Sequence, residues 1–256
     1  MDGLVRRRPP CRARRMTVAA TIDGGDRSLL LLADHAGAGV PDGIAIPPHL
    51  LTLHVGVDLG TDALTRALAE RLDAPAILGT VSRLVIDLHR ESDHPGLIPV
   101  VSDGHAIPGN VGADRVDHIA RFHAPYHRVI RAAVRRDRPR LIVAIHSFTP
   151  RLETGGGPRP WEAGILYGRD DRAARPALAF LREQAIVTGD NEPYSGRRLN
   201  ATLNRHAVAQ GIASLSVEVR NDLIADAAGV ARWCDLLARM VARVRNSLAL
   251  EGGLAT

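Results

Sequence analysis

The chain contains no lysine, only two cysteines and few aromatic residues, and it has no long apolar run. All 33 of its basic residues are arginines, which we attribute to codon usage. Because aromatics make up only 3% of its 256 residues, the core must consist mainly of aliphatic side chains, and base-stacking platforms for nucleic acid are not expected. No apolar stretch approaches the ~18 residues of a membrane-spanning helix, so we expect no membrane partner. Cys11 and Cys234 form no CxxC pair and no disulfide framework, which predicts a cytoplasmic protein.

The basic balance of the chain comes from its first 15 residues. The isoelectric point is about 10.1 and the formal net charge is +5. Six arginines against the single acid Asp2 give this tail a formal charge of +5, which equals that of the whole chain. We expect residues 1–16 to be a disordered or mis-annotated extension, with Met16 as the true start of translation, or else a functional basic arm. The remaining residues carry no net charge, so we expect no nucleic-acid partner.

Short aliphatic runs alternate with amphipathic segments along residues 17–250. The runs are typical of buried strands, and they span 28–34, 76–81, 84–88, 141–146, 163–167 and 212–220. Helical spacing of apolar residues occurs over 58–73, 114–136, 171–184, 199–210 and 226–248. Loops rich in glycine, proline or polar residues are expected at 93–112, 150–160 and 191–198. The pattern predicts one α/β domain with a mixed, mostly parallel central sheet and helices on both faces.

Two histidines, His35 and His146, each follow directly on an aliphatic run. Open α/β sheets bind their ligands in the crevice beyond the carboxyl ends of the strands, so we expect the two side chains to lie close together there. A catalytic metal needs a third protein ligand, and carboxylates near strand or helix ends are Asp34, Asp58 and Asp87. Strand alternation turns Asp34 to the face opposite its neighbouring histidine, which leaves Asp58 and Asp87.

Glu218 is the most suggestive of the remaining carboxylates. It lies within the apolar run 212–220, where burial would raise its pKa towards that of a general base. The alternative is a buried salt bridge with an arginine. Arg83, Arg90 and Arg220 also lie at the ends of predicted strands. Arginine is the preferred bidentate partner of a carboxylate, so these three residues indicate an anionic substrate.

Motifs of other catalytic classes are missing from the sequence. Ser147 follows His146 but lies in no GxSxG turn, and adjacent strand residues face opposite ways. No GxGxxG and no Walker A sequence is present, so a nucleotide is not an expected ligand. His118, His123 and His127 share one predicted helix without a zinc-type HExxH motif, and we expect them at the surface.

Five short motifs, in order along residues 28–245, resemble those of the N-formylglutamate amidohydrolase family. They are Asp34-His35-Ala36-Gly37, Val81-Ser82-Arg83-Leu84-Val85-Ile86-Asp87-Leu88-His89-Arg90, His146-Ser147-Phe148, Asn191-Glu192-Pro193-Tyr194-Ser195-Gly196 and Val217-Glu218-Val219-Arg220. That family is similar in fold to zinc carboxypeptidases and aspartoacylases. The resemblance implies a metal-dependent hydrolase of linear amides, acting in amino-acid catabolism such as histidine degradation. Its substrate would be a small anionic N-acyl amino acid such as N-formylglutamate.

The resemblance also implies roles for individual residues. His35 and His146 look like ligands of a divalent metal, for which zinc is expected, and Glu218 looks like the general base. Arg83, like Arg90 and Arg220, is a candidate for recognition of the substrate carboxylate, and we expect it also to act in catalysis, where an arginine would stabilise the oxyanion. The expected contacts of the substrate are Arg90, Arg220, His89, Asn191, Tyr194 and Ser195.

Three positions depart from the family's pattern. Ala38 stands where the HxxE motif of a zinc carboxypeptidase has its glutamate, so the third ligand must come from elsewhere, and we favour Asp58 over Asp87. Asp34 and His89 stand where family members often have serine and asparagine, and His89 adds a further candidate ligand or proton donor. The missing glutamate leaves one alternative open, a non-catalytic binding protein for an anionic N-acyl amino acid. We expect a monomer or a small homo-oligomer.

Overall fold

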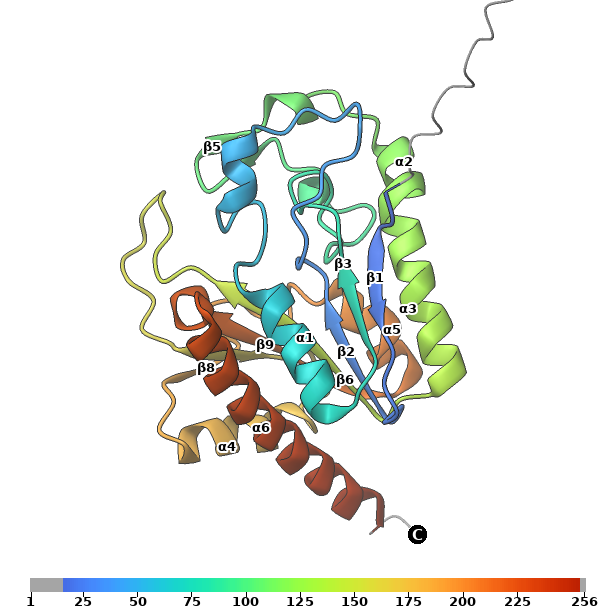
Figure 1. Ribbon diagram of the computed structural model, residues 1–256, viewed down its shortest axis with the longest axis vertical. Coiled ribbons are helices and arrows are strands. Elements are labelled where there is room, and N and C mark those ends of the chain that lie inside the picture. The colour runs from blue at the N-terminus through green and yellow to red at the C-terminus, as the bar shows by residue number, and fades with distance from the viewer. Residues whose placement is uncertain (1–15, 254–256) are drawn as a thin grey trace, which may run out of the picture.

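The computed structural model describes residues 16–253, and its centre is a seven-stranded sheet (Figure 1). In sheet order the strands are β1 (Ala19–Ile22), β3 (Ala76–Gly79), β2 (Leu29–Ala33), β6 (Leu141–Phe148), β9 (Ala213–Arg220), β7 (Ala163–Leu166) and β8 (Thr188–Asp190). Neighbours among β3, β2, β6 and β9 are parallel. β1 is antiparallel to β3, while β7 is antiparallel to β9 and parallel to β8. The sheet is therefore mixed and mostly parallel, as the sequence predicts.

Helices cover both faces of this sheet. The α-helices are α1 (Thr61–Leu72), α2 (Arg115–His118), α3 (Ala124–Asp137), α4 (Ala174–Glu183), α5 (Ala201–His206) and α6 (Ala227–Gly253). A π-helical segment, η4 (Ile119–His123), joins α2 to α3. Short 3-10 helices are η1 (Pro48–Thr52), η2 (Pro95–Leu97), η3 (Pro108–Asn110), η5 (Val208–Gln210) and η6 (Asn221–Ile224). Helices α1, α4 and α6 pack on one face of the sheet, and α3 and α5 pack on the other (Figure 1).

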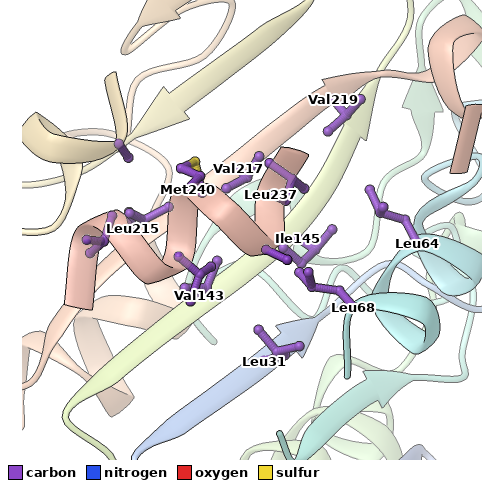
Figure 2. Close-up of a cluster of buried hydrophobic side chains, with 14 of the residues drawn as sticks. Leu31, Leu64, Leu68, Val143, Ile145, Leu215, Val217, Val219, Leu237 and Met240 are labelled. Atoms are coloured by element: carbon purple, nitrogen blue, oxygen red, sulfur yellow. The ribbon is translucent and has the colours of Figure 1, made fainter. Parts of the chain in front are cut away.

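Strand alternation divides the buried side chains between two clusters. Figure 2 shows the first, where Leu64 and Leu68 of α1 and Leu237 and Met240 of α6 meet odd-numbered residues of β2, β6 and β9: Leu31, Val143, Ile145, Leu215, Val217 and Val219. Even-numbered residues of β2, β6 and β9 face the other way, and Leu32 and Ala144 among them belong to the second cluster on the side of α3. Because His146 and Glu218 are even-numbered too, alternation places both on the α3 side of the sheet, at its carboxyl edge.

The predicted strand at 84–88 does not form. This apolar run is buried, but its backbone forms turns and irregular structure instead of a strand. Ser82 stabilises the start of the run, because its hydroxyl donates to the Gly56 carbonyl at 2.7 Å and accepts from the Leu84 N–H at 3.2 Å. Burial alone therefore does not distinguish a strand from a buried irregular segment.

Edge strands and loop structure account for the other differences from the predicted elements. β1 and β8 are short strands at the two edges of the sheet and were not predicted from the aliphatic pattern. The predicted loop 93–112 contains a hairpin of β4 (Val101–Ser102) and β5 (His105–Ala106). Its turn residues Asp103 and Gly104 both have positive φ angles, as tight two-residue hairpin turns require.

The long helix predicted over 114–136 is divided by the π-helical segment η4. Pro125 lies in the first turn of α3, directly after this segment. A proline ring clashes with the carbonyl four residues earlier in a regular α-helix, and a wider turn relieves that clash. The helix therefore continues through Pro125.

None of the helices within residues 16–253 is long and apolar enough to cross a bilayer. Residues 1–15, which hold the arginines of the predicted tail and Cys11, lie outside the described residues. Cys234 of α6 is a buried free thiol.

Candidate active site

Two strand ends bring His35 and His146 together. His146 belongs to β6, His35 lies two residues beyond β2, and their ring centroids are 5.1 Å apart. Gly37 lets the chain after His35 pass close to the end of β3, since a Cβ at this position would lie 2.4 Å from the carbonyl oxygen of Thr80. Further along the chain, the backbone N–H of Asp58 donates to the His35 carbonyl at 3.1 Å. This bond holds the segment before α1 against the strand ends.

The Asp58 carboxylate contacts both imidazole rings. Its Oδ2 atom lies 3.4 Å from Nδ1 of His35 and 2.9 Å from Nδ1 of His146. All three side chains are buried, and one ligand atom from each lies within 4.8 Å of the others. Two imidazole nitrogens and one carboxylate oxygen form a ligand set that zinc takes in catalytic sites.

Asp87 lies on the opposite side of the His35 ring from Asp58. Its Oδ1 atom is 2.7 Å from Nε2 of His35. Arg83 joins the two carboxylates, because its Nη1 donates to Asp58 at 2.9 Å and its Nη2 donates to Asp87 at 3.3 Å. Burial and the charge of Arg83 lower the pKa of His35, but the carboxylates of Asp87 and Asp58 outweigh them and raise it to about 9.

Asp34 faces the same site, contrary to the prediction from strand alternation. β2 ends at Ala33, so Asp34 lies in a turn where alternation no longer applies. Its Oδ2 atom is 2.6 Å from Nδ1 of His89 and 3.8 Å from Nε2 of His146. Its Oδ1 atom accepts a hydrogen bond from the Tyr126 hydroxyl at 2.6 Å. Asp34, His89 and His146 thus form a second group with the spacing of metal ligands.

Glu218 lies opposite His146 in the register between β9 and β6. The residue is 7% exposed, and among the described residues its Oε2 atom has no hydrogen-bond partner. Burial and the charge of Asp58 raise the pKa of Glu218 to about 8, against the opposing charge of Arg83. No arginine of residues 16–253 forms a salt bridge with it, so the alternative considered from the sequence is not found. A buried carboxyl that titrates near neutral pH is suited to general acid–base catalysis.

A cavity of about 100 Å³ beyond the carboxyl ends of β2, β6 and β9 is lined by His35, Asp58, Asp87, His146 and Glu218. Four further lining residues were predicted at the oxyanion or the substrate, namely Arg83, His89, Arg90 and Tyr194. Lining residues that the sequence analysis did not assign to the site are Ser147, Leu166, Leu199 and Ser216. Ser216 lies two residues before Glu218, so strand alternation could have identified it.

The sequence matches the family model of N-formylglutamate amidohydrolase over residues 27–225. The chain belongs to the N-formylglutamate amidohydrolase family. No curated protein sequence matches it. The family is one of amidohydrolases, and the match contains every residue described above for the candidate site.

Two solved structures share the fold of this family member. The gene product Atu2144 from Agrobacterium tumefaciens is 27% identical with a TM-score of 0.84, and the alignment covers 92% of this chain and 97% of that chain. The N-formylglutamate amidohydrolase from Ralstonia eutropha JMP134 is 20% identical with a TM-score of 0.69, over 93% of this chain and 100% of that chain. Both likenesses extend over nearly the whole chain, so the mixed sheet and its helices are common to all three proteins.

Arg220, which we predicted at the substrate, does not line the cavity. Its Nε donates to Asp222 at 2.8 Å and its Nη1 donates to the Trp161 carbonyl at 3.4 Å. β9 continues for two residues beyond Glu218, and this extra length carries Arg220 past the site. A charge at the end of a strand is therefore not by itself a sign of substrate contact.

Asn191 and Ser195 also lie outside the cavity lining, although Tyr194 between them belongs to it. The Asn191 side-chain oxygen accepts from the backbone N–H of Tyr167 at 3.1 Å and from that of Gly196 at 2.9 Å. The Ser195 hydroxyl accepts from the backbone N–H two residues later at 3.3 Å. Both polar side chains shape the loop after β8.

His123 and His127 are buried, contrary to the prediction that they lie at the surface. Nε2 of His127 is 3.1 Å from the Leu88 carbonyl, and Nε2 of His123 is 2.9 Å from the Arg90 carbonyl. These two carbonyls belong to the residues on either side of His89. The helical histidines therefore hold the backbone that places His89 in the cavity wall.

His206 of α5 extends this chain of buried rings. Its Nε2 atom lies 2.9 Å from Nδ1 of His127. Burial lowers the pKa of His127 to about 2 and that of His206 to about 4. Both rings are therefore neutral at physiological pH. His118 is buried as well, with Nδ1 2.8 Å from the Asp114 carbonyl.

Proposed function

We propose that the chain is a metal-dependent amidohydrolase that cleaves the linear amide of an N-formyl or N-acyl amino acid such as N-formylglutamate. The products are the amino acid and formate or another acid. One observation carries this proposal: two imidazole Nδ1 atoms and a carboxylate oxygen converge in a cavity that also contains the unpaired oxygen of Glu218. Membership of the family supports it.

His35, His146 and Asp58 would hold a divalent cation, and zinc suits this donor set. The residues present fit such an ion. Nε2 of His35 faces Asp87, which leaves Nδ1 of the neutral ring free to bind a metal. Nε2 of His146 is buried without a hydrogen-bond partner and lies 3.8 Å from Asp34, whereas Nδ1 of this ring faces Asp58. When bound, the cation would supply Lewis acidity, which lowers the pKa of water and polarises a carbonyl.

Asp58 supplies the carboxylate that Ala38 does not. It contacts Nδ1 of both histidines, whereas Asp87 contacts the opposite nitrogen of His35 alone. The alternative of a non-catalytic binding protein rested on the missing third ligand. Asp58 would take that place, which supports the enzyme over the alternative.

Glu218 would move the proton of the reaction. Its carboxylate takes a proton from the attacking water and gives it to the departing amine nitrogen as the C–N bond breaks. Arg83 lines the same cavity, and its positive charge would balance the negative charge that develops on the carbonyl oxygen.

Arg90 is the residue best placed to bind the carboxylate of the amino acid. Among the described residues, the only polar contact of its guanidinium joins Nε to Asp87 at 3.5 Å. Its terminal nitrogens are therefore free for a bidentate pair with a carboxylate. His89 and Tyr194 line the same cavity and would contact the bound amino acid.

Metal content and turnover, measured on the same preparation, test the proposal. We expect about one divalent cation per chain, loss of N-formylglutamate hydrolysis on chelation, and recovery when zinc is returned. A metal-free preparation with full turnover would contradict it. Stoichiometric binding of N-formylglutamate without hydrolysis, with metal supplied, would favour the binding protein instead.

A further inference from the structure

A second cavity adjoins the candidate active site. It has a volume of about 290 Å³, against about 100 Å³ for the active-site cavity itself. Arg83, Ser147 and Tyr194 line both cavities, so the two share a wall. Sites for small organic ligands span ~300–1,000 Å³. The active-site cavity alone is smaller than that range, and the adjoining cavity supplies the missing room.

The charged residues in the lining of the second cavity are already paired. Asp103 accepts hydrogen bonds from the Glu153 N–H at 2.8 Å, the Thr154 N–H at 3.0 Å and the Thr154 hydroxyl at 2.6 Å. Its Oδ2 atom also lies 2.9 Å from Nε2 of His54. Arg83, at the shared wall, donates to the two carboxylates described above. These charged groups are paired with partners within the protein, so the cavity does not need a charged ligand.

The rest of the lining is apolar or hydroxylic. Val55, Phe148 and Leu152 supply hydrocarbon surface, and Ser102 and Thr149 supply hydroxyl groups. Such a lining suits an uncharged aliphatic or weakly polar group. Arg90 lines the other cavity, and among the described residues its terminal nitrogens have no ion-pair partner, so the carboxylate-bearing half of an N-acyl amino acid belongs there.

From this division of charge we propose that the second cavity receives the acyl group of the substrate. The preferred substrates are then N-acyl amino acids whose uncharged acyl group is longer than formyl. This inference rests on the proposed function, because it assigns the two halves of the amide to the two sides of the same site.

A pair of variants in β4 tests the assignment. Ser102 lines the second cavity and its hydroxyl makes no hydrogen bond among the described residues, so Ser102→Trp would fill the space. Val101 is 59% exposed and adjacent residues of a strand face opposite ways, so Val101→Trp is the matched control. Leu152→Trp fills the same cavity from a different loop, in case Ser102→Trp does not fold.

Two readouts use N-formyl-, N-acetyl- and N-hexanoylglutamate with the zinc-loaded protein. In turnover, we expect kcat/KM to be at least about tenfold higher for the hexanoyl than for the acetyl compound. In calorimetry with the Glu218→Gln protein, we expect the hexanoyl compound to bind at least about tenfold more tightly than the formyl compound. Ser102→Trp or Leu152→Trp should abolish both preferences, and Val101→Trp should keep them.

The two readouts separate this inference from the proposed function. A hexanoyl preference in binding that Ser102→Trp or Leu152→Trp removes would support the acyl cavity even if no compound is hydrolysed. Equal binding of the formyl and hexanoyl compounds would overturn it, even if N-formylglutamate is hydrolysed well. A preference that survives both cavity-filling variants would overturn it too, because the acyl group would then lie elsewhere.

Discussion

Asp87 lies 2.7 Å from Nε2 of His35, the ring nitrogen turned away from Asp58. Carboxylates in this position behind a metal-bound histidine fix its tautomer and raise its basicity. The contact therefore supports different roles for the two aspartates, of which the sequence analysis favoured Asp58 as the metal ligand. Asp58 would bind the metal, and Asp87 would orient the ligand.

Asp87→Asn should weaken metal binding without abolishing it. The amide removes the negative charge behind His35, and outer contacts of this kind are worth about 10- to 100-fold in metal affinity. Asp58→Asn, which removes a ligand, should leave no tight site. A competition titration against a chromophoric chelator measures both, with exposed Asp93→Asn as the control. Equal affinity of the Asp87→Asn and parent proteins would contradict the assignment.

Metal binding at pH 7 should release protons. The neighbouring carboxylates raise the pKa of His35 to about 9, so in the metal-free protein this ring is protonated at pH 7. A metal binds only the neutral ring, and its apparent affinity should therefore rise with pH up to about 9. Calorimetry in buffers of different ionisation enthalpy counts the protons released. A binding enthalpy that does not depend on the buffer would show that His35 is not protonated.

The chain of buried histidines should make the protein less stable in mild acid. The folded-state pKa values of His127 and His206 are about 2 and about 4, below the ~6.5 of an unfolded histidine. At pH values between the unfolded-state pKa and the folded-state pKa of each histidine, the unfolded chain binds more protons than the folded one. Stability is therefore retained above pH 6.5 and lost progressively as the pH falls towards 4.

Urea unfolding at several pH values tests this behaviour. His206→Gln keeps an N–H donor for His127 but removes one titrating group, so its free energy of unfolding should depend less steeply on pH between 6.5 and 4. Exposed His49→Gln serves as the control and should keep the parent's slope. If His206→Gln keeps that slope as well, the titration of His206 does not cause the pH dependence of stability.

Arg90→Ala should weaken substrate binding, and Arg220→Ala should not. A hydrogen bond to a charged group is worth about 1.5–3 kcal/mol, which corresponds to a loss of about 10- to 100-fold in kcat/KM for N-formylglutamate. Arg220 is engaged with Asp222 and Trp161, outside the cavity, so it is the matched control. Metal content should be unchanged in both variants. A larger loss in Arg220→Ala than in Arg90→Ala would reverse their assignment.

The sequence was most informative where one strong constraint applied. Parallel strands place their carboxyl ends at one edge of a sheet, so His35 and His146 could be predicted as neighbours across more than a hundred residues of sequence. Glu218 could be placed in an apolar run, although only the register shows that it lies opposite His146.

Predictions failed where the outcome depended on a single residue of strand length or on long-range packing. Asp34 was predicted to lie on the opposite face because the predicted strand 28–34 ends one residue later than β2. Strand alternation was therefore applied to a residue that lies in a turn. Arg220 was expected at the substrate because it ends a predicted strand, but β9 extends past the cavity lining. The burial of His123 and His127 depends on carbonyls of a distant irregular segment, which no local pattern reveals.

Glu218→Gln tests the central claim, a metal site beside a separate proton carrier. The substitution keeps the size of the side chain but removes its ability to take a proton from water. With metal content and N-formylglutamate turnover measured on one sample, we predict about one metal ion per chain, as in the parent, and a loss of turnover of at least about 100-fold. Full turnover in Glu218→Gln would contradict the account.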